Sequence, residues 1–308
     1  MRPINEPKYQ VNVKDDINKG IALTFAFALF VPFVETSAKL LGENIAPPQI
    51  TFVRFFVHVI IFGIYIYFTM PRSDWRAKPS WPLIVRGIFS TSGTICVYAG
   101  LSVMPLVDAV AIFFLQPLIL TALSAVLLKE KVGMLRWSAV FLGMIGAMLV
   151  IGPNFDTIGW GATFPAMAAL FHSLSALIAR KWAGVATLPI FQFYTAASAV
   201  ILMGMLFIIA AVVGYDYVTP KIPNNFEWFL LAVVAFGSII TNLVLTQAFR
   251  IAPSSVIAPF LYLHIVGSAI MGYFIFHQLP SNQTILGGLL IISAGLFVWW
   301  REINKNLK

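Results

Sequence analysis

A chain of 308 residues, of which 59% are hydrophobic and 10% are charged, is unlike a soluble domain, in which about a quarter of the residues are charged. This composition predicts an integral membrane protein. The formal net charge of +8 does not indicate a nucleic-acid partner, because the basic residues are spread over several short loops instead of forming one patch. The single cysteine, Cys96, excludes an intrachain disulfide.

Ten apolar stretches along the chain approach the length of about 20 helical residues that a bilayer requires. They cover residues 20–41, 49–70, 82–103, 105–128, 134–152, 159–180, 187–213, 227–250, 253–276 and 283–300. The connections between them are short and contain no soluble domain. We therefore predict an all-α polytopic membrane protein with ten transmembrane helices.

Lysine and arginine are distributed unevenly between the two sides of the predicted membrane. If the N-terminus is cytoplasmic, most of the 20 basic residues lie on the cytoplasmic side, and the outer loops keep only Lys221. Cytoplasmic loops of membrane proteins carry such an excess of positive charge. We therefore expect residues 1–19 and 301–308 to be cytoplasmic tails of a protein in a bacterial inner or plasma membrane.

The two halves of the chain resemble each other weakly. A shift of 141 residues places Pro48 on Pro189, and a shift of 148 residues places Gln116 on His264. Each half would hold five spans, and an odd number of spans inverts the second half in the membrane. We predict two inverted five-helix repeats, an arrangement typical of secondary transporters, in residues 20–152 and 153–300.

Four prolines lie inside predicted spans, in the first and fourth span of each half: Pro32, Pro117, Pro165 and Pro259. A proline inside a helix removes one backbone hydrogen bond and clashes with the preceding turn. We expect these positions to be hinges. The alternative is that they reflect only the higher frequency of proline in membrane helices.

Charged side chains inside the first two spans are candidates for function, because a charge at the centre of a membrane helix is unfavourable by roughly 2.5–3.5 kcal/mol. Glu35 and Lys39 are four residues apart on the first span. Arg54 lies on the second span, at the same depth in the membrane as Glu35. We expect these three residues to form a gate or a charged anchor for substrate. The alternative is a structural ion pair that holds the two spans together.

A second group of polar and aromatic residues lies near the middle of the membrane. Polar side chains at this depth either line a cavity or bond neighbouring helices together. We predict that a substrate cavity is lined by Gln116, His264, Tyr262, Phe113, Phe114, Tyr98, Thr94, His172 and Asn242. The central pair is Gln116 with His264, since repeat symmetry would place these two side chains opposite each other.

The ten-span plan and the segment from Ala109 to Glu130, followed by Trp137 to Gly146, resemble the EamA type of the drug/metabolite transporter superfamily. Lys129 departs from the Leu-Gly-Glu-like turn of that family. The segment from 258 to 263 resembles the branch that contains S-adenosylmethionine uptake carriers, but Leu261 stands where an arginine is common there. The resemblance implies a central cavity between spans one, three, four, six, eight and nine.

We predict a secondary transporter that moves a small polar or amphipathic organic metabolite by alternating access, either driven by protons or in exchange for a counter-substrate. No cofactor, metal or nucleic acid is expected, and the protein would lie in the bilayer as a monomer or homodimer. The sequence contains no metal-binding, nucleophile or phosphate-loop motif of an enzyme. The alternatives are an intramembrane enzyme that acts on a lipid-linked substrate, and a channel or structural membrane protein.

The topology can be tested with reporter fusions. Fusions after residues 75, 132 and 304 should report the cytoplasm, because these positions lie in the basic loops and tail. A fusion near residue 220 should report the opposite side. A cytoplasmic signal at residue 220 would contradict the inverted repeat.

Overall fold

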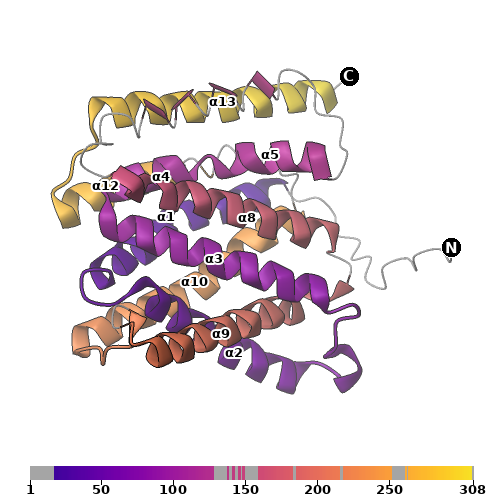
Figure 1. Cartoon of the computed structure of the whole chain (residues 1–308). Helices are drawn as coiled ribbons and strands as arrows, with labels where there is room; N and C mark the ends of the chain where they lie inside the picture. The colour runs from indigo at the N-terminus through magenta and orange to yellow at the C-terminus, as the bar shows by residue number, and fades with distance from the viewer. Residues whose placement is uncertain are drawn as a thin grey trace.

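The regular structure of this protein is helical throughout the part of the chain that the computed structural model describes, and that part contains no strand. It comprises residues 17–127, 137–138, 141–142, 145–146, 148–149, 159–182, 185–215, 218–251, 261 and 263–306. The main helices are α1 (Ile17–Leu41), α2 (Pro47–Thr69), α3 (Trp81–Val103), α4 (Leu106–Phe113), α5 (Gln116–Leu127), α8 (Thr163–Lys181), α9 (Leu188–Val213), α10 (Asn225–Ile251), α12 (Leu263–Phe276) and α13 (Asn282–Asn306) (Figure 1). The all-helical fold class is confirmed.

Six of these helices contain a segment long and apolar enough to cross a membrane: Asn18–Leu41, Pro47–Thr69, Trp81–Val103, Gly159–Ala179, Leu188–Val213 and Asn225–Leu245. Shorter apolar segments lie at 106–120, 263–276 and 282–294. These nine segments correspond to nine of the ten predicted spans. Most of the remaining predicted span, at 134–152, lies outside the described residues.

The helices of the two halves pack against each other and not only within each half. The most extensive contacts join α1 with α10, α3 with α8, and α2 with α9. The Gln49 side chain makes hydrogen bonds of 2.6 and 2.9 Å with the main chain of Lys221, so α2 and α10 begin at the same end of the molecule. Thr187, just before α9, lies 3.9 Å from the sulfur of Met70, just after α2. Helices α2 and α9 are therefore antiparallel.

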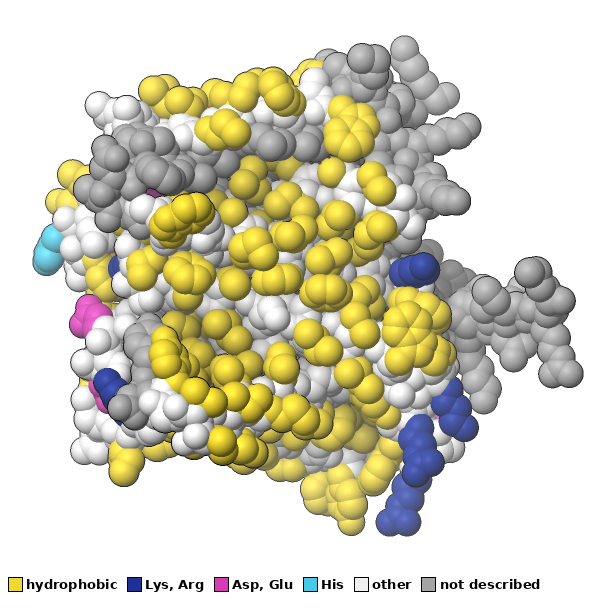
Figure 2. Space-filling model, in the orientation of Figure 1, with side chains coloured by type: hydrophobic (Ala, Val, Ile, Leu, Met, Phe, Trp, Pro, Cys, Tyr) yellow, Lys and Arg dark blue, Asp and Glu magenta, His cyan; other side chains and the backbone are white. Residues whose placement is uncertain are grey.

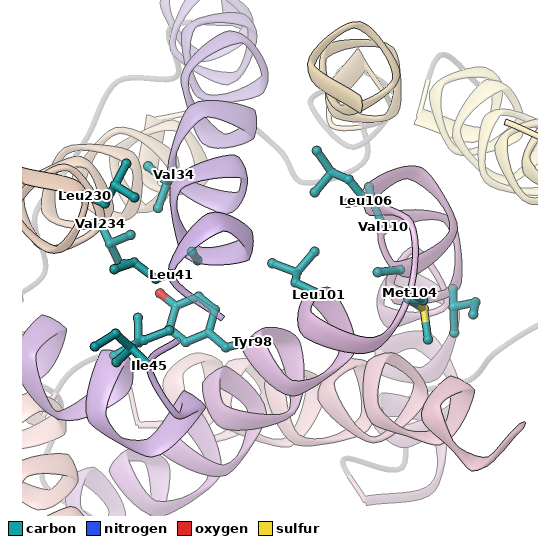
Figure 3. Close-up of a cluster of buried hydrophobic side chains, with 14 of the residues drawn as sticks. Val34, Leu41, Ile45, Tyr98, Leu101, Met104, Leu106, Val110, Leu230 and Val234 are labelled. Carbon is teal, nitrogen blue, oxygen red and sulfur yellow. The ribbon is translucent and has the colours of Figure 1, made fainter. Parts of the chain in front are cut away.

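The largest buried cluster of hydrophobic side chains lies where α1, α3, α4 and α10 meet (Figure 3). Val34 and Leu41 come from α1, Tyr98 from α3, and Leu230 and Val234 from α10. These residues lie far apart in the sequence, so this cluster ties the two halves of the chain together. Between helices in a bilayer such packing stabilises the fold through van der Waals contact, because lipid tails are as apolar as these side chains.

The surface of the molecule is also apolar. Figure 2 shows hydrophobic side chains over most of the visible face, while Lys and Arg side chains gather at the right-hand end, near the connection of α2 with α3. Phe68 is 77% exposed and Val212 is 82% exposed. Apolar patches of this extent are rare on soluble monomers, but they match a lipid environment. The protein is an integral membrane protein.

The predicted interior prolines differ in their effect on the helices. Pro32 lies inside α1, which continues through it to Leu41. Helices α4 and α5 are separated by a turn at Phe114 and Leu115, because the ring of Pro117 excludes the helical geometry of the preceding turn. Pro259 lies outside the described residues.

Pro165 corrects the sequence prediction. It lies in the first turn of α8, which begins at Thr163 after a short 3-10 helix at Gly159–Ala162, and not in the helix interior. The first backbone N–H groups of a helix have no partner within the helix, so a proline is tolerated there without a break. The expected pairing of Pro32 with Pro165 as equivalent interior breaks is therefore wrong.

The close approach of α3 and α9 can be tested at Gly87. A Cβ atom at this position would lie 2.6 Å from Cβ of Ser198 and 3.0 Å from the carbonyl oxygen of Thr195. We expect Gly87→Ala to lower the free energy of unfolding by about 1–3 kcal/mol, because the two helices must move apart. Gly204→Ala on α9 is the matched control, since a Cβ atom there meets no heavy atom within 4 Å. Equal thermal stability of the two variants in detergent would contradict this packing.

Candidate functional site

A buried hydrogen bond between a carboxylate and an imidazole joins the two halves of the chain inside the helix bundle. Oε2 of Glu35 on α1 lies 2.7 Å from Nε2 of His264 on α12, and their side chains are only 12% and 5% exposed. The rings of Phe27 and Phe114 meet the imidazole edge to face, at centroid distances of 6.3 and 5.6 Å. Two ionisable groups therefore share a hydrogen bond in largely apolar surroundings.

The fold explains why these two side chains meet. Helix α12 packs along α1 so closely that a Cβ atom at Gly267 would lie 2.6 Å from the ring of Pro32. His264 lies one turn before Gly267, and Glu35 lies one turn after Pro32. Their long side chains bridge the remaining distance across the contact. The absence of a side chain at Gly267 therefore allows the approach that brings carboxylate and imidazole together.

The partner of Glu35 differs from the sequence prediction, which placed Lys39 or Arg54 beside it. The ammonium group of Lys39 donates to the carbonyl oxygens of Leu101 and Met104, at 2.7 and 2.5 Å. Carbonyl groups at the C-terminal end of a helix such as α3 have no partner within the helix and attract a cation. Lys39 is thus bound where α3 ends, one turn beyond Glu35.

Arg54 is also directed away from Glu35. Its Nη1 donates to the hydroxyl of Tyr98 on α3 at 3.0 Å, while its Nε is buried without a hydrogen-bond partner. Tyr98 is 2% exposed and belongs to the large hydrophobic cluster of α1, α3, α4 and α10. Two predicted site residues are therefore in contact, but Arg54 joins α2 to α3 and not to the carboxylate on α1.

Among the other predicted cavity residues, those of α4 and α5 contact α8, and Thr94 is bound within α3. His172 on α8 meets the ring of Phe113 edge to face at a centroid distance of 5.6 Å. The main-chain oxygen of Gln116 accepts a hydrogen bond of 3.0 Å from Ser173, and its side chain bonds to none of the described residues. The hydroxyl of Thr94 is bound within its own helix, at 2.9 Å from the Ser90 oxygen.

The expected pair of Gln116 with His264 is replaced in this structure, since His264 is bound to Glu35. Asn242 is partly buried on α10, and Tyr262 lies outside the described residues. The hollow lined by Leu106, Val107, Gly272 and their neighbours has no room for a water molecule, and none of its residues is a predicted site residue.

Sequence reasoning missed one functional candidate, Arg86, by assigning it to the basic residues of the cytoplasmic side. It lies in α3, where its Nη1 donates to the Thr195 hydroxyl and its guanidinium stacks on Phe191 at 4.7 Å. Asp108 in the first turn of α4 accepts a hydrogen bond of 2.7 Å from Thr284 on α13. The position of Arg86 within the predicted span 82–103 was a signal that could have identified it.

The chemistry available at these positions is acid–base and ionic. The described residues contain no group of three or more His, Cys, Asp or Glu side chains that could hold a metal ion. The carboxylate and imidazole of Glu35 and His264 can exchange a proton, and the guanidinium groups can bind an anion.

Comparison with known proteins identifies the class. Residues 18–152 match the EamA-like transporter family. The S-adenosylmethionine uptake transporter of Rickettsia bellii is 26% identical over 268 residues, which cover 87% of this chain and 89% of that protein. The riboflavin transporter of Rhizobium johnstonii is 25% identical over 253 residues, which cover 80% of this chain and 81% of that protein. A solved crystal structure shares the fold, with a TM-score of 0.65 and 16% identity over 94% of this chain and 99% of the other.

The chain is therefore a membrane transporter and not an enzyme. Its first half matches the EamA-like transporter family, and the resemblance to EamA-type drug/metabolite transporters that the sequence predicts is confirmed.

A double-mutant cycle tests the bond between α1 and α12. We expect Glu35→Leu and His264→Leu each to lower the free energy of unfolding, by about 1–3 kcal/mol, because each leaves a buried polar group without its partner. The double variant should be more stable than the sum of the two effects predicts, since it leaves no such group. The measurement is unfolding by SDS titration in mixed micelles, with exposed His277→Asn as the control. Strictly additive effects would show that the two side chains do not interact.

Proposed function

We propose that this protein is a secondary transporter that moves a small polar or amphipathic organic metabolite across the membrane by alternating access. The observation that carries the proposal is the bond between Glu35 and His264, a buried pair of ionisable groups at the contact of two helices from different halves. Ionisable residues inside a membrane mark substrate or ion pathways by default. Transport would run on a proton gradient or on exchange with a counter-substrate.

The inverted repeat is supported by the way the helices pack. Suppose that α8, α9 and α10 are the equivalents of α1, α2 and α3, and that α12 is the equivalent of α4 and α5. The contact of α1 with α10 then corresponds to that of α8 with α3, and the contact of α1 with α12 corresponds to that of α8 with α5. Every major contact between the halves has such a counterpart. Residues 20–152 and 153–300 would be the two repeats, with both termini in the cytoplasm.

Two such halves can exchange inward-facing and outward-facing shapes about a central site. The central site would lie between α1, α3, α4, α8, α10 and α12, with Phe113, Phe114 and Tyr98 as its aromatic surfaces. Asn242, Thr94, His172 and Gln116 would contribute polar groups to it, as would Tyr262. The turn ahead of Pro117 and the proline at 259 would let the helix ends move.

The two halves differ at a pair of positions that matters for the transport cycle. The repeat shifts of 141 and 148 residues place Ala176 at the position equivalent to Glu35 and Gln116 at the position equivalent to His264. A carboxylate–imidazole hydrogen bond therefore joins α1 to α12, and the equivalent contact of α8 with α5 has none among the described residues. We propose that the Glu35–His264 bond closes one side of the transporter and breaks when that side opens. Lys39, bound where α3 ends one turn beyond Glu35, would complete this gate.

The printed activities of the relatives suggest a substrate class. S-adenosylmethionine and riboflavin are both polar molecules with a heteroaromatic ring system, and proteins that carry them are 26% and 25% identical to this chain. Aromatic side chains bind such rings by stacking and edge-to-face contact. A metabolite of this kind would lie against Phe114, whose ring already contacts His264.

Counterflow in proteoliposomes tests the proposed function. Vesicles loaded with unlabelled S-adenosylmethionine or riboflavin should take up the labelled solute faster than empty vesicles, because a carrier returns more rapidly when loaded. Phe114→Ala should reduce saturable uptake roughly tenfold, and Phe68→Ala on the exposed apolar surface should leave it unchanged. Uptake that is not saturable and shows no stimulation from inside would identify a channel.

A further inference from the structure

The interior of this protein contains positive charge that no carboxylate of the described helices neutralises. Three acidic side chains of these helices are already engaged. Glu35 is bound to His264, Asp108 accepts a hydrogen bond from α13, and Glu227 caps the start of α10 through the main chain of residue 224. The two arginines of α2 and α3 have no acidic partner among the described residues.

Most of the hydrogen-bond donors of Arg54 and Arg86 have no acceptor among the described residues. A guanidinium group has five N–H donors. Arg54 uses one on the hydroxyl of Tyr98, and Arg86 uses one on the hydroxyl of Thr195. In both residues the Nε atom is buried and has no partner. A buried donor without an acceptor destabilises a fold, and a buried cation without an anion does so more strongly.

The two guanidinium groups lie along one helix. Arg86 is part of α3, and Arg54 contacts the same helix at Tyr98. Tyr98 lies twelve residues after Arg86, which is about 18 Å further along the helix axis. His172 stands between them, because its ring lies on Gly93, where a Cβ atom would come within 2.7 Å of it. The result is a basic track along α3, defined by Arg54, His172 and Arg86.

We infer that the basic track along α3 binds the acidic group, a carboxylate or a phosphate, of the transported metabolite. This inference rests on the proposed transport function and narrows its substrate class to organic anions and zwitterions. An acidic oxygen at either arginine would accept the unused N–H groups, and charge-assisted bonds of this kind are the strongest that a guanidinium forms. The two arginines would bind the acidic group in turn, near the two ends of α3, as the protein alternates.

An anionic lipid headgroup offers the same phosphate chemistry as a soluble metabolite. The apolar surface of the helices lies in lipid, so a headgroup is the second source of an acidic oxygen. The two sources differ in one respect that can be measured. A metabolite anion acts from solution in detergent, whereas a headgroup acts only when the lipid is supplied.

The test uses purified full-length protein and measures thermal stability in detergent with millimolar inorganic phosphate, acetate or chloride at equal ionic strength. We expect phosphate and acetate to raise the Tm saturably by a few degrees over chloride, and Arg54→Gln/Arg86→Gln to lose this response. The apparent Kd should rise at least about tenfold in each single variant. Arg54→Lys/Arg86→Lys should keep part of the response, and exposed Arg72→Gln/Arg76→Gln, which removes equal charge, should keep all of it.

A structural role for the arginines predicts a different pattern. If they only join helices, the Gln variants lose several degrees of Tm in chloride, and the response to phosphate is the same in every protein; either result overturns the inference. A second arm places the protein in nanodiscs of phosphatidylcholine with and without phosphatidylglycerol. Arginine-dependent stabilisation by phosphatidylglycerol alone, with no effect of free phosphate or acetate, would assign the track to lipid and also overturn it.

The counterflow assay separates this inference from the proposed function. Saturable counterflow in a protein whose Tm ignores phosphate and acetate would refute the basic track and leave the transporter intact. An arginine-dependent anion response without counterflow of S-adenosylmethionine, riboflavin or riboflavin 5′-phosphate would support the track and count against the proposed substrates.

Discussion

The bond between Glu35 and His264 is the interaction on which the rest of the account depends, because it joins helices of both halves inside an apolar bundle. Either ionisable group alone would destabilise the apolar bundle, and the bond between them offsets that effect. The packing of α12 on α1 at Gly267 and Pro32 brings them together, and the rings of Phe27 and Phe114 surround the imidazole. A bond of this kind suits a gate, because proton transfer or a competing bond to the substrate can break it.

The helices themselves could be predicted from the sequence, because a bilayer imposes a length on every apolar stretch. Helices α1, α2, α3 and α9 begin and end within a few residues of the predicted spans. The interruption near Pro117 was also predictable, since a proline ring acts on its own preceding turn. Pro165 was misplaced for a local reason: the sequence does not show that a 3-10 helix precedes it and that the α-helix begins only at Thr163.

The candidate site was predicted as a set of residues but not as a set of contacts. Spacing along the sequence reveals neighbours on one helix and on consecutive helices, and it therefore suggested Lys39 and Arg54 as partners of Glu35. The true partner comes from α12, and no pattern within α1 or α2 contains that information. Arg86 was missed because a basic residue at the fifth position of a predicted span was assigned to the loop before it, although its guanidinium bonds to α9.

The central claim is that α1 and α12 separate at this contact during transport, and a reversible cross-link tests it directly. An ideal Cβ atom at Gly267 lies 3.5 Å from Cβ of Pro32, within the range of about 3.5–4.5 Å that a disulfide requires. In a Cys96→Ser background, the Pro32→Cys/Gly267→Cys variant should show counterflow when reduced, lose it on oxidation, and regain it with dithiothreitol. Counterflow at the same rate in the fully cross-linked protein would contradict the claim.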